Sequence, residues 1–161
     1  MESAPVFIRC DVTSELEVQS ASELSIATRP PRPSCRPTPP SADGERGLLI
    51  HTSSVAAYDG QIGQVAYSAT KAAVTGMVLP IARELAGSGI RCVAIAPGIF
   101  RTPMISAMKP ELQESPGRQV PFPARLREPG EFAQLVGAIF ELPYLTGETI
   151  RLDGAIRMQS K

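Results

Sequence analysis

Short apolar runs alternate along the chain with longer segments of helical character. Four runs have the length of a buried strand: residues 6–10, 47–54, 91–96 and 147–154. Three segments predict helices: residues 14–25, 66–86 and 128–142. The first opens on a capping box, and the last has apolar side chains at helical spacing. Strands that alternate with helices indicate βαβ units and a parallel sheet.

The composition changes sharply between residues 29 and 41, where six prolines and three arginines occur. Proline at that density sustains neither a helix nor a strand ladder. We therefore predict three parts: a strand–helix remnant at residues 1–27, a Pro/Arg-rich linker at 28–46 and a packed domain at 47–161.

Sixteen basic and sixteen acidic residues leave no net charge, so nothing indicates nucleic acid or an anionic membrane surface as a partner. No apolar run approaches the length of a membrane-spanning helix. The start of the chain has no targeting pattern. Its three cysteines are expected to be free thiols in a reducing compartment. We expect a soluble intracellular protein of the mitochondrial matrix or the cytoplasm.

Three residues form the candidate catalytic set. Tyr67 and Lys71 are four residues apart, which places them one turn apart on one face of the predicted helix. A cation beside a phenol stabilises the phenolate and favours proton transfer. Ser54 follows the strand run and can hydrogen-bond the same substrate oxygen. His51, the single histidine, is interpreted as structural, and the cysteines fit no metal spacing.

Taken alone, a tyrosine and a lysine at this spacing are more often a surface pair. Here Tyr67 follows Ser54 by thirteen positions, and buried strands precede and follow the pair. From Gly47 onward the chain resembles the short-chain dehydrogenase/reductase family. The segments at 54–57, 60–64, 119–123 and 151–158 resemble a branch that oxidises 3-hydroxyacyl-CoA and hydroxysteroid-type alcohols with NAD.

This resemblance implies a fold and a set of roles. The fold is α/β, a partial Rossmann-like, doubly wound parallel sheet. Tyr67 is the implied general acid/base, Lys71 supports its phenolate and binds the nicotinamide ribose, and Ser54 orients the substrate oxygen.

The resemblance also implies contacts with the cofactor. Phe100 and Thr102 are expected near the nicotinamide, and Asp11 and Val12 near the adenine. NAD rests on the resemblance, and NADP stays open.

The chain departs from the family at the cofactor-binding half. It has no glycine-rich dinucleotide fingerprint, and its glycine pair at 87–89 precedes a strand instead of following one. We expect a truncated member whose strand at Leu48 has an unpaired edge.

Three interpretations stay open for such a chain. It is an oxidoreductase, or an interaction protein that pairs with a full-length homologue, or the product of a splice event or faulty gene model. The small residues of the predicted helix at 66–86 favour helix–helix contact, so we expect a homo-oligomer or pairing with a homologue.

Overall fold

The computed structural model describes residues 41–101, 117 and 119–160. In chain order its elements are β1 (Gly47–Thr52), the short helix η1 (Val55–Ala57), α2 (Val65–Leu85), the short helix η2 (Ala86–Ser88), β2 (Ile90–Pro97), α5 (Pro129–Glu141) and β3 (Thr149–Leu152). The predicted remnant at 1–27 and residues 28–40 of the predicted linker lie outside the described residues, as do Asp11, Val12 and Thr102.

The three strands form one parallel sheet in the order β1-β2-β3. Strand β2 is central, and Ile95 lies opposite Ile150 of β3 in the register. Residues 91–96 of β2 are all buried. This is expected for a nearly continuous apolar run in a parallel sheet that is covered on both faces. The predicted α/β class is therefore confirmed.

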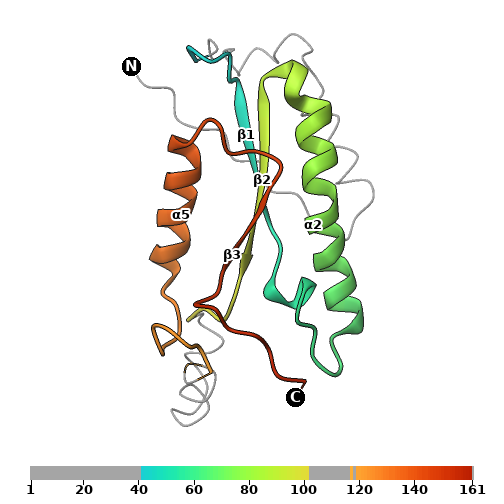
Figure 1. Ribbon diagram of the computed structural model, residues 1–161, viewed down its shortest axis with the longest axis vertical. Helices are drawn as coiled ribbons and strands as arrows, with labels where there is room; N and C mark the ends of the chain where they lie inside the picture. The colour runs from blue at the N-terminus through green and yellow to red at the C-terminus, as the bar shows by residue number, and fades with distance from the viewer. Residues whose placement is uncertain (1–40, 102–116, 118, 161) are drawn as a thin grey trace, which may run out of the picture.

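The helices α2 and α5 cover opposite faces of the sheet (Figure 1). Alternate residues of β2 face the two layers. Cys92 and Ala94 pack with residues of α2 such as Val78, while Val93 and Ile95 pack with Ile139 of α5. This arrangement is the predicted doubly wound sheet, with a core layer on each side.

Both ends of α5 are held by specific contacts. At its start, Glu128 and Glu131 form a capping box with Pro129 in the first turn. At its end, the buried side chain of Arg91 donates hydrogen bonds to the carbonyl oxygens of Ile139, Phe140, Leu142 and Leu145. A cation at a helix C-terminus satisfies carbonyls that have no partner within the helix.

Residues 41–46, predicted to belong to the linker, contact the packed domain. The amide of Arg46 donates to the carbonyl of Gly89 at 2.7 Å. The carboxylate of Glu45 pairs with the guanidinium of Arg91 at 2.9 Å. The ordered contacts of the domain therefore begin several residues before the predicted boundary at Gly47.

Residues Val65–Ser88 are long and apolar enough, by length and composition alone, to cross a membrane. This finding differs from the expectation that no apolar run approaches the length of a membrane-spanning helix. In the structure the buried residues of α2 pack against the sheet. The core helix of a soluble protein passes the same test, so the length and composition of this segment are weak evidence for a membrane span.

Candidate active site

The candidate catalytic residues meet where β1 ends. In parallel α/β sheets, ligands bind outside the carboxyl ends of the strands. Beyond β1 the chain enters η1, which lies beside the first turns of α2 (Figure 1). The hydroxyl of Ser53 donates to the carbonyl of Lys71 at 2.9 Å and lies 2.9 Å from the hydroxyl of Thr75. These bonds join the end of β1 to the helix that carries Tyr67.

Tyr67 and Lys71 lie on one face of α2, as their spacing predicts. The Lys71 ammonium is 5.8 Å from the centre of the Tyr67 ring. It also donates to the carbonyl of Thr52 at 3.0 Å, which holds the cation at the end of β1. The Tyr67 side chain is about half exposed, so its hydroxyl is accessible to a substrate.

Ser54 lies at the turn between β1 and η1 and is 8% exposed. Its hydroxyl oxygen accepts a hydrogen bond from the amide of Ala56 at 3.1 Å and so caps η1. A serine oxygen that accepts such a bond keeps its own proton for donation to another oxygen. The sequence predicted the position of Ser54 but not its capping bond.

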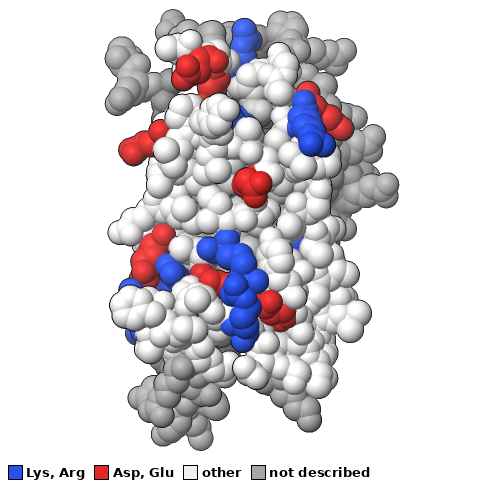
Figure 2. Space-filling view, in the orientation of Figure 1, with Lys and Arg blue, Asp and Glu red and all other residues white. Residues whose placement is uncertain are grey.

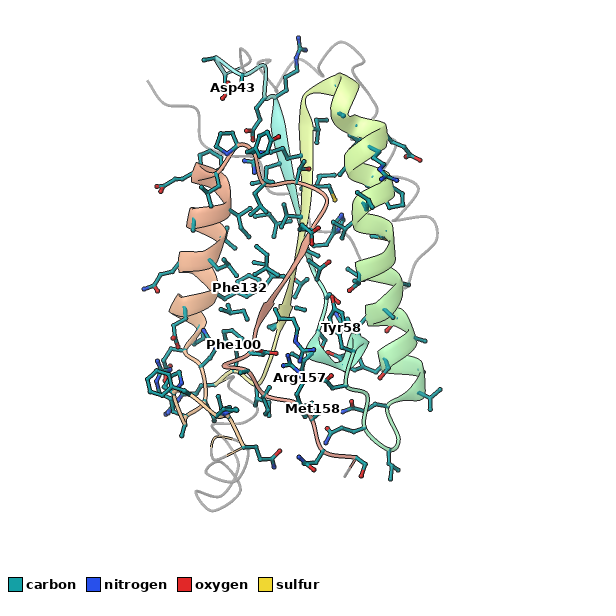
Figure 3. The ribbon with its side chains drawn as sticks, viewed as in Figure 1. Asp43, Tyr58, Phe100, Phe132, Arg157 and Met158 are labelled. Atoms are coloured by element: carbon teal, nitrogen blue, oxygen red, sulfur yellow. The ribbon has the colours of Figure 1, made fainter. Side chains whose placement is uncertain are left out.

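Phe100, which the family resemblance places near the nicotinamide, has contacts with two residues around the start of α5. Its ring packs edge-on against Phe132 of α5, with centroids 6.2 Å apart (Figure 3). Its backbone forms a bridge with Arg127. These contacts anchor the segment after β2 to α5, and the predicted contact with a nicotinamide stays a prediction.

Two ion pairs of Arg151, which sequence reasoning did not find, involve the loop between η1 and α2 and the end of β3. Arg151 of β3 forms an ion pair with Asp59 at 2.6 Å, in the loop that leads from η1 to α2. A second pair joins Arg151 to Asp153 at 2.7 Å. A basic residue in the last strand and a single carboxylate in a loop give no local signal of this pairing.

The described residues fit one end of a dinucleotide. Lys71 uses one N–H on Thr52, and an ammonium has three, so donors remain for the hydroxyls of a ribose beside Tyr67. The pyrophosphate end is different. The N-terminus of α5 is occupied by the carboxylate of Glu131, whose pKa is lowered to about 2, chiefly by its hydrogen bond from Arg125.

A pyrophosphate is typically held by a glycine-rich turn that leads from a strand into a helix. The sequence has no such turn. Nor does any group of three or more His, Cys, Asp or Glu side chains in the described part of the chain have the arrangement of a metal site.

Comparison with known proteins identifies the class. Residues 36–113 match the model of the short chain dehydrogenase family. The chain belongs to this family of oxidoreductases, which generally use NAD or NADP. It is 58% identical over 119 residues to the 3-hydroxyacyl-CoA dehydrogenase type-2 of Drosophila melanogaster, an alignment that covers 74% of this chain and 47% of that relative.

Solved structures agree with this assignment. The crystal structure of 3-hydroxyacyl-CoA dehydrogenase type-2 from Mycobacterium avium matches with a TM-score of 0.72 and 43% identity, over 76% of this chain and 46% of that one. A 3-oxoacyl-[acyl-carrier protein] reductase from Brucella melitensis with bound NAD matches with a TM-score of 0.61 and 33% identity, over 71% of this chain and 42% of that one. The chain thus spans about half the length of these relatives.

Proposed function

We propose that this chain carries the catalytic half of a dehydrogenase that transfers hydride between NAD and a secondary alcohol of the 3-hydroxyacyl-CoA or hydroxysteroid type. One observation supports the proposal most. Tyr67 and Lys71 lie one turn apart at the end of β1, with the ammonium held on Thr52 next to Ser54. The substrate class follows the relatives named as 3-hydroxyacyl-CoA dehydrogenases.

Each residue has a distinct task in this proposal. Tyr67 takes the hydroxyl proton of the alcohol as the carbon–hydrogen bond breaks and the carbonyl forms. Lys71 favours the phenolate that accepts this proton, because an adjacent cation stabilises an anion. Ser54 donates a hydrogen bond to the substrate oxygen and orients it toward Tyr67. Bound NAD would accept the hydride, which completes the two-electron oxidation.

The cofactor is expected to bind mainly through its nicotinamide ribose. Lys71 is the residue that would hold the ribose hydroxyls. Backbone N–H groups at a helix N-terminus normally add much of the affinity for a dinucleotide. Because the sequence offers no glycine-rich turn for this purpose, activity should need cofactor concentrations far above those typical of the family.

The first prediction tests Tyr67. Tyr67→Phe keeps the ring and removes the transferable proton, so the rate of 3-hydroxyacyl-CoA oxidation at millimolar NAD should fall by about 10²–10⁴-fold. The matched control is Tyr144→Phe, since Tyr144 is fully exposed and should keep the wild-type rate. NADH absorbance measures both rates. Wild-type activity in Tyr67→Phe would refute the role of Tyr67.

A second function, pairing with a longer dehydrogenase subunit, is favoured by a different observation. The outer face of α2 carries Ala69, Ala72, Ala73 and Gly76 at helical spacing, and all four are exposed. A stripe of small residues allows close approach of another helix. Light scattering after mixing with a full-length homologue tests this function. Replacing Ala73 by Glu should abolish a mixed complex, whereas two separate species from the unaltered proteins would exclude it.

A further inference from the structure

The loop Tyr58–Gln64 connects the two halves of the candidate site, because it runs from the turn of Ser54 to the helix of Tyr67. We propose that Arg151 is a positioning residue, which holds this loop through Asp59 and thereby sets the placement of Ser54 relative to Tyr67. The proposal rests on the proposed catalytic function for its consequence, but its contacts can be tested without it.

Arg151 holds the loop with both an ion pair and its guanidinium face. Its Nη2 lies 2.6 Å from one carboxylate oxygen of Asp59, and its Nη1 lies 3.5 Å from the other. The guanidinium carbon is 5.0 Å from the centre of the Tyr58 ring. Both charged side chains are mostly buried. A forked contact between arginine and carboxylate restricts orientation as well as distance.

A second carboxylate orients Arg151 from its own side. Its Nε donates to Asp153 at 2.7 Å, and the other oxygen of Asp153 accepts from the amide of Ala155 at 2.9 Å. Arg157 approaches Asp153 at 3.4 Å. Two arginines thus pair with two aspartates. Basic and acidic side chains lie next to one another on the face of the molecule shown in Figure 2. The charges are balanced within the cluster, which suits a structural tie better than a binding site for an anion.

The segment after β3 also contacts the loop Tyr58–Gln64 through hydrogen bonds. The side chain of Gln61 donates to the carbonyl of Gln159 at 3.0 Å. The amide of Ile62 donates to the carbonyl of Ser160 at 3.0 Å. The hydrogen bond from Arg151 is the main reason that the pKa of Asp59 lies below its usual value.

The loop transmits this placement to both catalytic residues. On one side, the amide of Asp59 donates to the carbonyl of Val55 at 2.9 Å, inside the short helix that Ser54 caps. On the other side, Gly60 lies so close to α2 that a Cβ there would be 2.5 Å from the hydroxyl of Ser68, the neighbour of Tyr67. A shift of Asp59 is therefore expected to move the short helix that Ser54 caps and the turn of α2 that carries Ser68 and Tyr67.

Hydrogen–deuterium exchange of the loop amides in the full chain tests the tie directly. In Arg151→Gln the amide of Ile62 should exchange at least about 10-fold faster, since hydrogen bonds to charged groups contribute that much or more to a local equilibrium. Arg157→Gln is the matched control, because Arg157 pairs with Asp153 but forms no hydrogen bond or ion pair with Asp59 among the described residues. Equal exchange in wild type and Arg151→Gln would overturn the proposal.

A double-mutant cycle with Asp59→Asn distinguishes loss of the Arg151–Asp59 pair from general unfolding of the chain. If the two residues act as a pair, the double variant should exchange no faster than either single variant. Additive effects would contradict the pairing. Asp59→Asn keeps the size of the side chain and removes its charge, so it tests the tie even where Arg151→Gln fails to fold.

Kinetics separate positioning from stability. Arg151→Gln should lower kcat about 10-fold or more with little change in KM, since misplacement acts on the reacting geometry. Arg151→Lys should not restore kcat, because lysine lacks the fork. A loss of thermal stability with unchanged kcat would overturn the proposal. Absence of any dehydrogenase activity in the wild type would instead count against the proposed function, and the exchange experiment would still decide the tie.

Discussion

Strands β2 and β1 lie side by side but differ in their surroundings. Strand β2 is paired on both edges and buried at six consecutive residues. Strand β1 is paired only with β2 among the described residues, and all its residues but the last, which is exposed, are half-buried. Yet the candidate catalytic groups gather at the end of β1. The two strands therefore have different roles. Strand β2 forms the centre of the core, and the less buried strand β1 positions the candidate catalytic groups.

This difference agrees with the comparisons with relatives. The chain spans about half of their length, and the part that matches the family model, residues 36–113, contains α2 with the candidate residues Tyr67 and Lys71. An unpaired strand edge offers backbone N–H and C=O groups to another strand. We expect β1 to gain most from any partner that completes the sheet.

Two isoleucines on the α5 face provide the sharpest test of the contrast between the strands. Ile95 of β2 is fully buried, while Ile50 of β1 is half-buried in the same cluster. Ile95→Ala should lower the free energy of unfolding by about 4 kcal/mol, the range for a cavity in a packed core. Ile50→Ala should cost about 1–2 kcal/mol, because less apolar surface is lost. Equal losses in urea unfolding would remove the contrast.

Removal of the Arg91 side chain should have the next largest effect. Its guanidinium holds Glu45 and four carbonyl oxygens at the end of α5. Arg91→Ala leaves these groups without a donor and should cost about 3 kcal/mol. Circular dichroism during urea unfolding measures the loss. The control is Arg46→Ala, whose side chain is exposed; a comparable loss there would deny Arg91 its anchoring role.

His51 gives a smaller effect that depends on pH. Burial lowers its pKa below the usual value of about 6.5, so the unfolded chain binds a proton before the folded one does. The contribution of neutral His51 to the free energy of unfolding is therefore fully present above pH 7. It is lost as the pH drops below about 6.5. Unfolding measured at pH 7.5 and pH 5.5 should show this loss in the wild type and a smaller one in His51→Gln. The same slope in both proteins would assign the loss elsewhere.

The elements of the packed domain were predictable because their signals are local. The apolar run at β2, the capping box at Glu128 and the spacing of Tyr67 and Lys71 each lie within a few residues. The elements agree with prediction to within about two residues at most ends. The position of Ser54 directly after β1 was also predicted. Its capping bond was not, because no sequence pattern predicted the short helix η1.

Long-range contacts could not be predicted in this way. Arg91 meets Glu45 across 46 residues, and Arg151 meets Asp59 across 92. Each partner looks like an ordinary surface charge in its own segment. Phe100 likewise has no local signal that its ring packs on Phe132. Such pairs follow from the topology of the sheet, which brings distant segments together.

Titration of the full chain with NADH, followed by fluorescence, tests the central claim most directly. The claim is that the described residues hold the candidate catalytic groups proposed above, while the sequence has no glycine-rich fingerprint for a pyrophosphate. We therefore predict no saturable binding at micromolar NADH. Saturable binding with a Kd of about 1 μM, worth roughly 8 kcal/mol, would contradict the account.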